Sequence, residues 1–459
     1  MKIRIEKDSM GEINVSEEKY WAAQTQRSFE NFKIGDEKMP LELIKAMARV
    51  KKAASFANFK CDILDENKMN LIHQVCDEII NEEHNDQFPL VIWQTGSGTQ
   101  TNMNLNEVIA NRIQFLKYGK IGEQPLFVHP NDDVNKSQST NDVFPTAMRI
   151  AAYKTLQTKT IPELSLLQKV FAEKALNFAN VVKTGRTHMM DATPVTLGQE
   201  MKSFADQLKT SLELLIYSSE LLTELPIGGT ATGSQLNAPK NYDILAAEFL
   251  SKEMGFTFKP AECKATHMAT LDSFVHVSST LKNTAVSLMK IANDIRLLAS
   301  GPRCGLGEIH IPANEPGSSI MPGKVNPTQV EALTMVCAQI MGNDYAITIG
   351  GMQGHLQLNV FMPLIIRNIL HSANILADSC RSFRLHCVEG IEPNLPKIKE
   401  HLNNSLMLVT ALNPHIGYSN AAKIAQKALR EDLTLKEAAL QSGVSENDFD
   451  KWVDPYKMV

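Results

Sequence analysis

The segment 271–299 constrains the fold of this chain more than any other. Its apolar and small residues recur at spacings of three and four, in the order Leu271, Phe274, Ser278, Leu281, Ala285, Leu288, Ala292, Ile295 and Ala299. That spacing places them all on one face of a single α-helix about 40 Å long. Because alanine and serine let neighbouring helices approach closely, the segment predicts a bundle of long helices.

Other segments carry helical patterns, and the two ends of the chain differ from its middle. Helical spacing begins at Leu41 and returns over 194–222 and 328–347. Before the last of these, we expect Asn326 to cap the helix and Pro327 to occupy its first turn. We predict a mainly α fold with a mixed N-terminal domain over 1–140, a central long-helix bundle domain over 141–388 and a small helical domain over 389–459.

The charge balance argues against a nucleic-acid partner. Lys plus Arg number 46 against 51 Asp plus Glu, a formal net charge of -5. No basic excess is therefore present to favour a phosphate backbone.

The cysteines and the hydropathy pattern predict a cytoplasmic protein. The seven cysteines are scattered, without a C-x-x-C pair or zinc-like spacing, which is typical of buried thiols in a reducing compartment. The start, MKIRIEKDSMGEI, lacks the apolar run of a signal peptide. No stretch reaches the roughly 18 consecutive apolar residues of a membrane span. We expect an oligomer, because such a bundle presents apolar surface at its sides.

The segment GSSIMPGKVNP at 317–327 is the strongest candidate for chemistry. It combines Ser318, Ser319, Lys324 and Asn326 with glycines and prolines just ahead of a helix. Glycine permits motion and proline restrains it, which suits a lid that closes over a ligand. A lysine and a helix start both favour an anion, so carboxylate binding is expected. A surface turn with a solvated lysine is the alternative.

The segment TGRTHMMDATP at 184–194 places His188 in a polar turn before a helix. Histidine is the usual general acid or base near neutral pH and needs a partner to orient it. Glu331 is that partner if the helix after Pro327 passes nearby. A structural or surface histidine is the alternative.

The segment GSGTQTNMN at 96–104 looks superficially like a phosphate loop. It lacks the G-K-[ST] ending, and Thr101 stands where G-x-G-x-x-G needs its last glycine. Its hydroxyls and amides, with Ser139, Thr140 and Asn141 of KSQSTND, can instead bind carboxylate oxygens. Helix capping by the same residues is the alternative.

Together these segments resemble the fumarase/aspartase superfamily. GSSIMPGKVNP matches its most specific signature, and the segments KYWAAQTQRS, QTGSGTQTNMNLNE, HPNDDVNKSQSTNDVFPTAM, GRTHMMDATPVTLGQE and SLMLVTALNPHIGY are all similar to class II fumarases. The resemblance spans nearly the whole chain. It implies a three-domain fumarase/aspartase-like fold and a homotetramer whose active sites are each built from segments of three subunits.

The resemblance also implies an activity, the reversible anti addition of water to fumarate to give L-malate, without metal or organic cofactor. Ser318 is the implied base, its oxyanion favoured by loop N–H groups and nearby positive charge. His188, paired with Glu331, acts on the hydroxyl or water side. The implied contacts to the small dicarboxylate substrate are Ser97, Gly98, Thr99, Ser139, Thr140, Asn141, Thr187, Ser319, Lys324, Val325 and Asn326.

The residues His129, Pro130, Asn131 and Asp132 resemble a second dicarboxylate site seen in fumarases. The apolar residues just before them limit cationic help at that site. As an ordinary turn, HPND would need no ligand.

Rival functions are separated by a few residues. Aspartate ammonia-lyases usually carry Gln at the position of His188 and Ala at that of Gly323, so both positions favour fumarase, whereas QGHLQLN at 353–359 is closer to aspartases. Argininosuccinate and adenylosuccinate lyases need contacts for bulky substituents, and their signature residues are not apparent. A non-catalytic protein of the same fold, or a helical scaffold for partner proteins, would not need Ser318 and Lys324.

Overall fold

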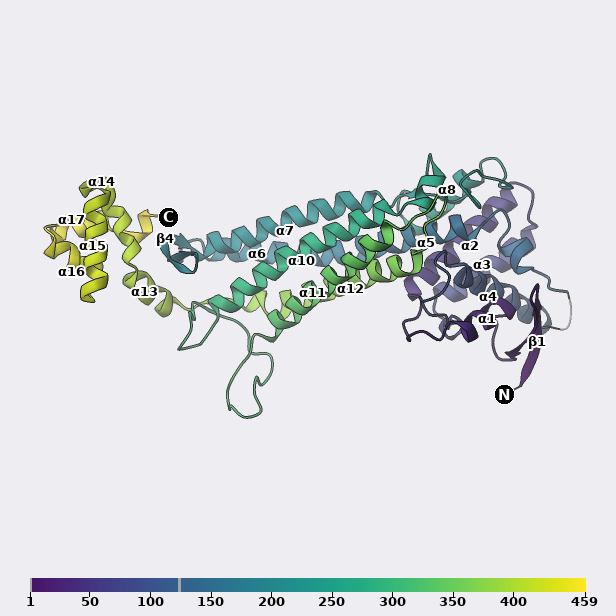
Figure 1. Cartoon of the computed structure of the whole chain (residues 1–459), viewed down its shortest axis with the longest axis horizontal. Coiled ribbons are helices and arrows are strands. Elements are labelled where there is room, and N and C mark those ends of the chain that lie inside the picture. The colour runs from purple at the N-terminus through teal and green to yellow at the C-terminus, as the bar shows by residue number, and fades with distance from the viewer. Residues whose placement is uncertain (1, 123–124) are drawn as a thin grey trace. The chain divides into compact units, whose positions relative to one another are not determined.

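The computed structural model describes residues 2–122 and 125–459 and is dominated by helices (Figure 1). It contains two compact units. The first comprises residues 1–161, 213–283 and 338–376, and the second comprises 162–212, 284–337 and 377–459. The division into three domains stays a prediction.

The N-terminal part of the first unit contains both strands and helices. Strands β1 (Ile3–Asp8) and β2 (Gly11–Ser16) form an antiparallel hairpin in which Ile3 lies opposite Ser16, and α1 (Ala23–Asn31) follows. Helix α2 (Leu41–Lys60) begins where the helical pattern begins and contacts α3 (Glu66–Ile80), α5 (Thr140–Thr155) and α8 (Tyr242–Met254). Helix α4 (Thr99–Tyr118) packs on α3 and α5.

The long helices are α7 (Leu197–Glu220), α10 (Asp272–Leu298), α11 (Thr328–Gly351) and α12 (Met362–His386). Figure 1 shows α10 as one unbroken helix. The first eight residues of its predicted face, from Leu271 to Ile295, are all buried, and Ala299 lies just past the helix end. The predicted long-helix bundle is confirmed.

Polar side chains link the long helices within the first unit. Ser218 of α7 shares a hydrogen bond with Thr280 of α10 (2.9 Å), and Ser278 of α10 donates to Asp344 of α11 (2.7 Å). The α11 helix is joined to α12 by a bond from the Asn343 amide to the Ser372 hydroxyl (2.9 Å). A serine hydroxyl takes part in each of these three bonds.

Two helix starts differ from their predictions. The segment 194–196 belongs to strand β4 (Met190–Thr196), because Pro194, Val195 and Thr196 pair with β3 (Val182–Thr187) and α7 begins only at Leu197. Asn326 does not cap α11 with its side chain. Its amide nitrogen donates instead to the carbonyl of Gly317 (2.6 Å).

The second unit combines α6 (Ile161–Asn177), from its second residue on, with the β3–β4 hairpin and a cluster of C-terminal helices. These are α13 (Leu395–Asn404), α14 (Asn413–Ile416), α15 (Tyr418–Glu431), α16 (Leu435–Gln441) and α17 (Glu446–Trp452). Their small core contains Leu412, Ile424, Ala438 and Phe449. The segment after Glu389 is helical, as the sequence predicted, and its standing as a separate domain stays a prediction.

Short strands form two further pairs. Strands β5 (Glu224–Leu225) and β6 (Lys259–Pro260) pair in parallel, and β7 (Ile309–His310) pairs antiparallel with β8 (Glu392–Pro393). Helix α9 (Lys264–Ala269) lies between β6 and α10 in the chain, and two π-helical turns span Pro130–Val134 and Leu156–Thr160. None of the described helices combines the length and apolar character needed to cross a bilayer.

Candidate active site

Ser318 lies in a loop that is closed at its base by its own hydrogen bonds. The Gly317 N–H donates to the carbonyl of Lys324 (2.7 Å), and the Asn326 amide donates to the carbonyl of Gly317 (2.6 Å). A Cβ at position 317 would lie 2.7 Å from the Lys324 oxygen, so this closure needs glycine. Ser318 and Lys324 are therefore held on one small closed loop.

The backbone of the same loop points two N–H groups at the Ser318 hydroxyl. Ile320 N and Met321 N donate to Ser318 Oγ at 3.2 and 3.0 Å. Donors aimed at an oxygen stabilise negative charge on it, as in an oxyanion hole. The arrangement can therefore help Ser318 act as an oxyanion, which a serine needs in order to serve as a base.

A cavity of about 410 Å³ lies beside this loop, within the second unit. Lys324, Val325 and Asn326 line it together with Arg296 and His310. Ser319 and Lys324 are exposed to solvent. The cations make this face of the loop suitable for a carboxylate-bearing ligand.

His188 lies at the tip of the β3–β4 hairpin, not in a turn leading straight into a helix as its sequence context predicted. Thr187 ends β3, and His188 and Met189 form a two-residue turn with φ of 56° and 63°. Positive φ at both positions is the pattern of a type I′ turn, which favours Asn and Gly. Two bulky residues are therefore held in a strained backbone, and Thr187 and His188 are exposed to solvent.

Glu331, the predicted partner of His188, is exposed in the first turn of α11. Within the described part of the second unit, no hydrogen bond joins Glu331 to His188. The pairing therefore stays a prediction.

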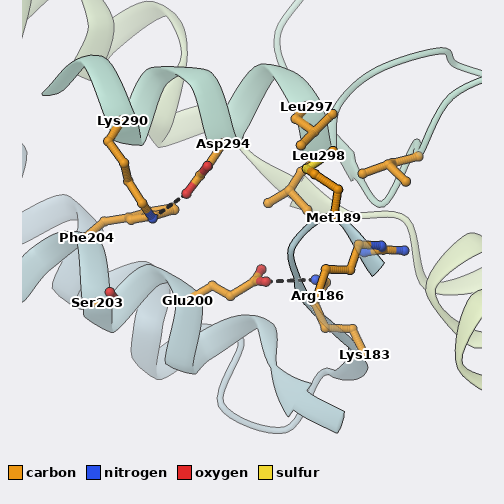
Figure 2. Close-up of a pocket in the computed structure, with 11 residues that line it drawn as sticks. Lys183, Arg186, Met189, Glu200, Ser203, Phe204, Lys290, Asp294, Leu297 and Leu298 are labelled. Atoms are coloured by element: carbon orange, nitrogen blue, oxygen red, sulfur yellow. Dashed lines mark hydrogen bonds and ion pairs between the residues drawn. The ribbon is translucent and has the colours of Figure 1, made fainter. Parts of the chain in front are cut away.

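The base of the His188 hairpin is anchored by a buried ionic network. Glu308 is fully buried, accepts hydrogen bonds from Arg186 (2.8 Å) and His401 (3.0 Å), and forms an ion pair with Lys183 (3.0 Å). Burial raises the pKa of Glu308, but hydrogen bonds and charge from Arg186, Lys183 and His401 outweigh it and bring the pKa down to about 2. Lys183 also contacts Glu200 of α7 (2.8 Å; Figure 2). This network holds β3, the strand that ends just before His188.

The first unit holds the predicted segment at the start of α4. Gly98 has φ of 78° and precedes Thr99, the first residue of the helix. A Cβ at Gly98 would lie 2.2 Å from the Phe144 ring, so glycine is required there. The hydroxyls of Ser97 and Thr99 are 2.8 Å apart. They sit where a helix N-terminus favours an anion.

The second segment of the first unit starts α5 in the same way. Ser139 is its N-cap and accepts from Asn141 N (3.2 Å), while Asp142 accepts from Ser139 N (2.9 Å). Asp142 also accepts from Gly228 N (2.9 Å) and Thr230 N (3.0 Å). Burial raises the pKa of Asp142 to about 7 against these hydrogen bonds. Capping and ligand binding can coexist here, because the side chains of Thr140 and Asn141 are not used by the cap.

The two segments are joined by a residue that sequence reasoning did not single out. Asn102 Nδ2 donates to Thr140 Oγ1 (2.9 Å) and to Asn135 Oδ1 (3.2 Å). Asn135 in turn accepts from Lys51 Nζ (2.9 Å), whose pKa burial lowers to about 7. The available sequence signal was the S-x-x-D capping box at Ser139 and a lysine inside an Ala-rich helix. Thus α4 and α5 start side by side, and both starts carry predicted substrate contacts.

The predicted site residues are divided between the two units. Ser97, Gly98, Thr99, Ser139, Thr140 and Asn141 belong to the first, and Thr187, His188, Ser318, Ser319, Lys324, Val325, Asn326 and Glu331 belong to the second. Their roles as catalytic and binding residues stay predictions.

The predicted second site surrounds the π-helical turn Pro130–Val134. His129 Nδ1 accepts from Asn131 N (3.3 Å) and Asp132 N (3.2 Å). The described lining of the adjacent cavity, about 480 Å³, includes Glu6, Asp8 and Glu107 beside Lys7. Its charge is thus mostly acidic, which disfavours a dicarboxylate, and the second site stays a prediction.

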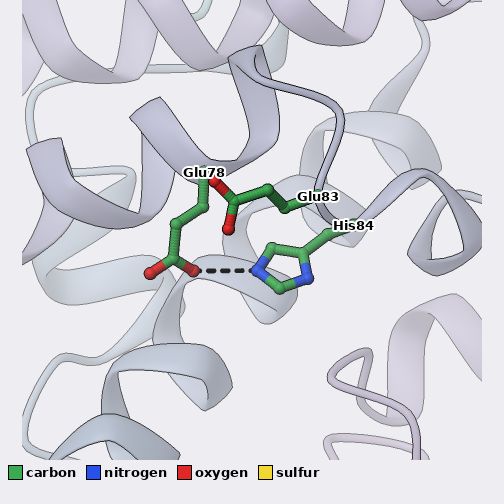
Figure 3. A group of neighbouring side chains, drawn as sticks. All are labelled: Glu78, Glu83 and His84. Carbon is green, nitrogen blue, oxygen red and sulfur yellow. Dashed lines mark hydrogen bonds and ion pairs between the residues drawn. The ribbon is translucent and has the colours of Figure 1, made fainter.

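One group in the described residues has the spacing of a metal site. Ligand atoms of Glu78, Glu83 and His84 all lie within 4.8 Å of one another (Figure 3). Glu78 is already bound by Arg112 (2.8 Å) and His84 (2.8 Å). The guanidinium supplies the positive charge that a cation would bring, so the group fits a structural ion cluster.

Family comparisons identify the class of protein. The model described as lyase matches residues 11–342, and that of the fumarase C C-terminus matches residues 408–459. The fold and the matched ranges define a lyase. Within that class, the chain belongs to the class II fumarase family.

Individual relatives agree along the whole length. Fumarate hydratase class II of Pasteurella multocida is 59% identical over 461 residues, covering 100% of this chain and 99% of that protein, and the Helicobacter pylori protein of the same name is 55% identical over 460 residues, with the same coverage. The crystal structure of a class II fumarase from Schistosoma mansoni matches with a TM-score of 0.97 and 43% identity, covering 100% of this chain and 99% of that one. None of these relatives carries the name of the aspartase rival.

Proposed function

We propose that this chain catalyses the reversible hydration of fumarate to L-malate, a step of the citric acid cycle. The observation that carries the proposal is the closed 317–326 loop, in which two backbone N–H groups point at Ser318 Oγ and Lys324 lies on the same loop. In a class II fumarase, deprotonation next to a carboxylate requires a base and a positive charge, and this loop offers Ser318 and Lys324 for these roles.

In the dehydration of malate, Ser318 Oγ, as an oxyanion, takes the proton from the carbon beside one carboxylate. The electron pair left on that carbon spreads onto the carboxylate, giving an aci-anion, and the hydroxyl then leaves from the neighbouring carbon as water. The proton that the leaving hydroxyl needs comes from His188 or from a water bound to His188, and Glu331 orients the imidazole. Fumarate remains.

The substrate has two carboxylates, and the proposed contacts come in two sets. Ser97, Thr99, Thr140 and Asn141 lie at the starts of α4 and α5, whose free N–H ends favour negative charge. Lys324 and Asn326, with Thr187 and Ser319, supply the second set. Donors placed on the carboxylate that becomes the aci-anion lower the barrier, because its charge is greatest in the transition state.

We further propose a homotetramer in which each active site combines segments of three subunits. The exposed positions of His188 and Glu331 support this, since neighbouring copies would cover them. So do large apolar side chains on the long helices, with Tyr217 and Tyr345 each 71% exposed and Met335 67% exposed. A reducing, cytoplasmic location is supported by the seven free cysteines.

The test is the absorbance of fumarate after the purified protein is added in the presence of a chelator. We expect hydration to persist in the chelator and to fall by about a thousandfold or more in Ser318→Ala and His188→Asn. An ammonia assay with aspartate runs in parallel. Ammonia release without hydration would show that the chain is an aspartate ammonia-lyase. Full activity of either variant would show that the substituted residue is not catalytic.

A further inference from the structure

A second basic cavity lies in the first unit, apart from every segment proposed to bind substrate. Its volume is about 340 Å³, and it is formed by α2, by the end of α5 and by the π-helical turn that follows. Lys45, Arg49, Lys154 and Lys159 converge on it, against the carboxylates of Glu42 and Glu82. Four cations at one cavity are unexpected in a chain of net charge -5.

The nearby carboxylates neutralise only part of this charge. Lys45 is paired with Glu82, and Arg49 lies 3.8 Å from Glu253, which also binds Lys52 at 3.2 Å. Lys159 bonds to the neutral amide of Asn374 (3.0 Å). In the described residues, Lys154 has no carboxylate within ion-pair distance.

The cations also repel one another. Burial lowers the pKa of Lys154, and the charges of Arg49, Lys45 and Lys159 lower it further. Lys45 and Arg49 are four residues apart on α2, a spacing at which like charges destabilise a helix. A bound anion would relieve this repulsion.

The backbone at the cavity is also unusual. Leu156–Thr160 form a π-helical turn that carries Thr158 and Lys159 into the lining. Turns of this kind inside helices are rare and occur frequently at functional sites. The side chain of Thr155 adds a hydroxyl beside the four cations.

We propose that this cavity is a binding site for a polyphosphate anion, either inorganic or part of a nucleotide. Arginine and lysine together bind phosphate oxygens through the guanidinium fork and the ammonium point charge. Multiple negative charges on one small ligand match Lys154 and Lys159, which have no carboxylate partner among the described residues. The site is independent of the proposed hydration reaction.

The experiment is calorimetric titration of the full-length protein with pyrophosphate at constant ionic strength. We expect saturable binding that weakens about tenfold or more in Lys154→Ala and in Arg49→Ala, the loss of one charge-assisted contact. Lys169→Ala removes the same charge from an exposed position elsewhere and should bind like the wild type. Titration with ATP separates the sources: tighter binding of ATP indicates a nucleotide, and equal binding indicates inorganic polyphosphate.

Two controls separate the proposal from simpler explanations. Lys324→Ala should still bind pyrophosphate. Loss of binding in this variant would place pyrophosphate at the proposed substrate loop and overturn the proposal. Equal affinities of Lys154→Ala and Lys169→Ala would overturn it as well, as would the absence of saturable binding to the wild type. Lys154→Ala should not lower the thermal midpoint, because it removes repulsion, so lost binding cannot be ascribed to unfolding.

Discussion

Asn102 determines how the Thr140 hydroxyl can be used. One of its amide hydrogens is directed to Asn135 Oδ1 and the other to Thr140 Oγ1. Thr140 thus accepts from the protein and keeps its own O–H for a ligand. A hydroxyl oriented in this way is free to donate to a carboxylate oxygen, which only accepts hydrogen bonds.

We therefore predict that Asn102→Ala raises KM for fumarate about tenfold and changes kcat less, because a contact made in both ground and transition states is weakened. Asn106→Ala is the matched control, since Asn106 Nδ2 also donates to Asn135 (3.3 Å) but does not reach Thr140. Steady-state kinetics of both variants test this. Equal increases in KM would mean that the network supports the fold and does not orient Thr140.

Glu308 gives the stability of the second unit a pH dependence. Its pKa is lowered from 4.5 to about 2, so its contribution is complete above about pH 4.5 and disappears as the pH falls toward 2. Glu308→Gln should cost about 3 kcal/mol or more near neutral pH, because Lys183 and Arg186 lose their buried counter-charge. Thermal unfolding should show this difference shrinking as the pH falls from about 4.5 toward 2. A difference that stays constant would contradict the ionic origin.

At the scale of elements, the hairpin that presents His188 stores strain in its turn. Met189 has φ of 63°, and its side chain is 66% exposed. We predict that Met189→Gly is more stable than Met189→Ala by about 1 kcal/mol, since both lose the same side chain but only alanine keeps the left-handed cost. Chemical denaturation measures the difference. Equal stabilities would show that the turn relaxes.

How far the elements could be predicted depended on whether their signal was local. The face of α10 repeats along one helix, so its spacing was sufficient to predict it. The predicted start of α7 was wrong because 194–196 pair with residues of β3. Pairing between strands leaves no signal in the helical spacing of the sequence. Likewise, the Asn326 side chain found a partner nine residues earlier instead of capping α11. The loop sequence predicted Ser318 and Lys324, whereas Asn102 and Lys51 matter only through contacts distant in sequence.

At the scale of the whole molecule, the proposed assembly predicts complementation. If His188 and Ser318 of one site come from different subunits, co-expressed His188→Asn and Ser318→Ala chains will form some sites that carry neither substitution. Random mixing would restore about a quarter of the activity. The activity of mixed oligomers isolated by two different affinity tags tests this. Mixed oligomers as inactive as either parent would show that both residues act from one subunit.

The hydrogen bonds across the base of the 317–326 loop have a kinetic consequence. A swing of this loop would carry Ser318 and Lys324 together, because Gly317 is bonded to Lys324 and Asn326. Proton abstraction and charge neutralisation would then become available in the same instant. The opening frequency of that loop would set an upper limit on turnover, however fast the bond-breaking step itself is.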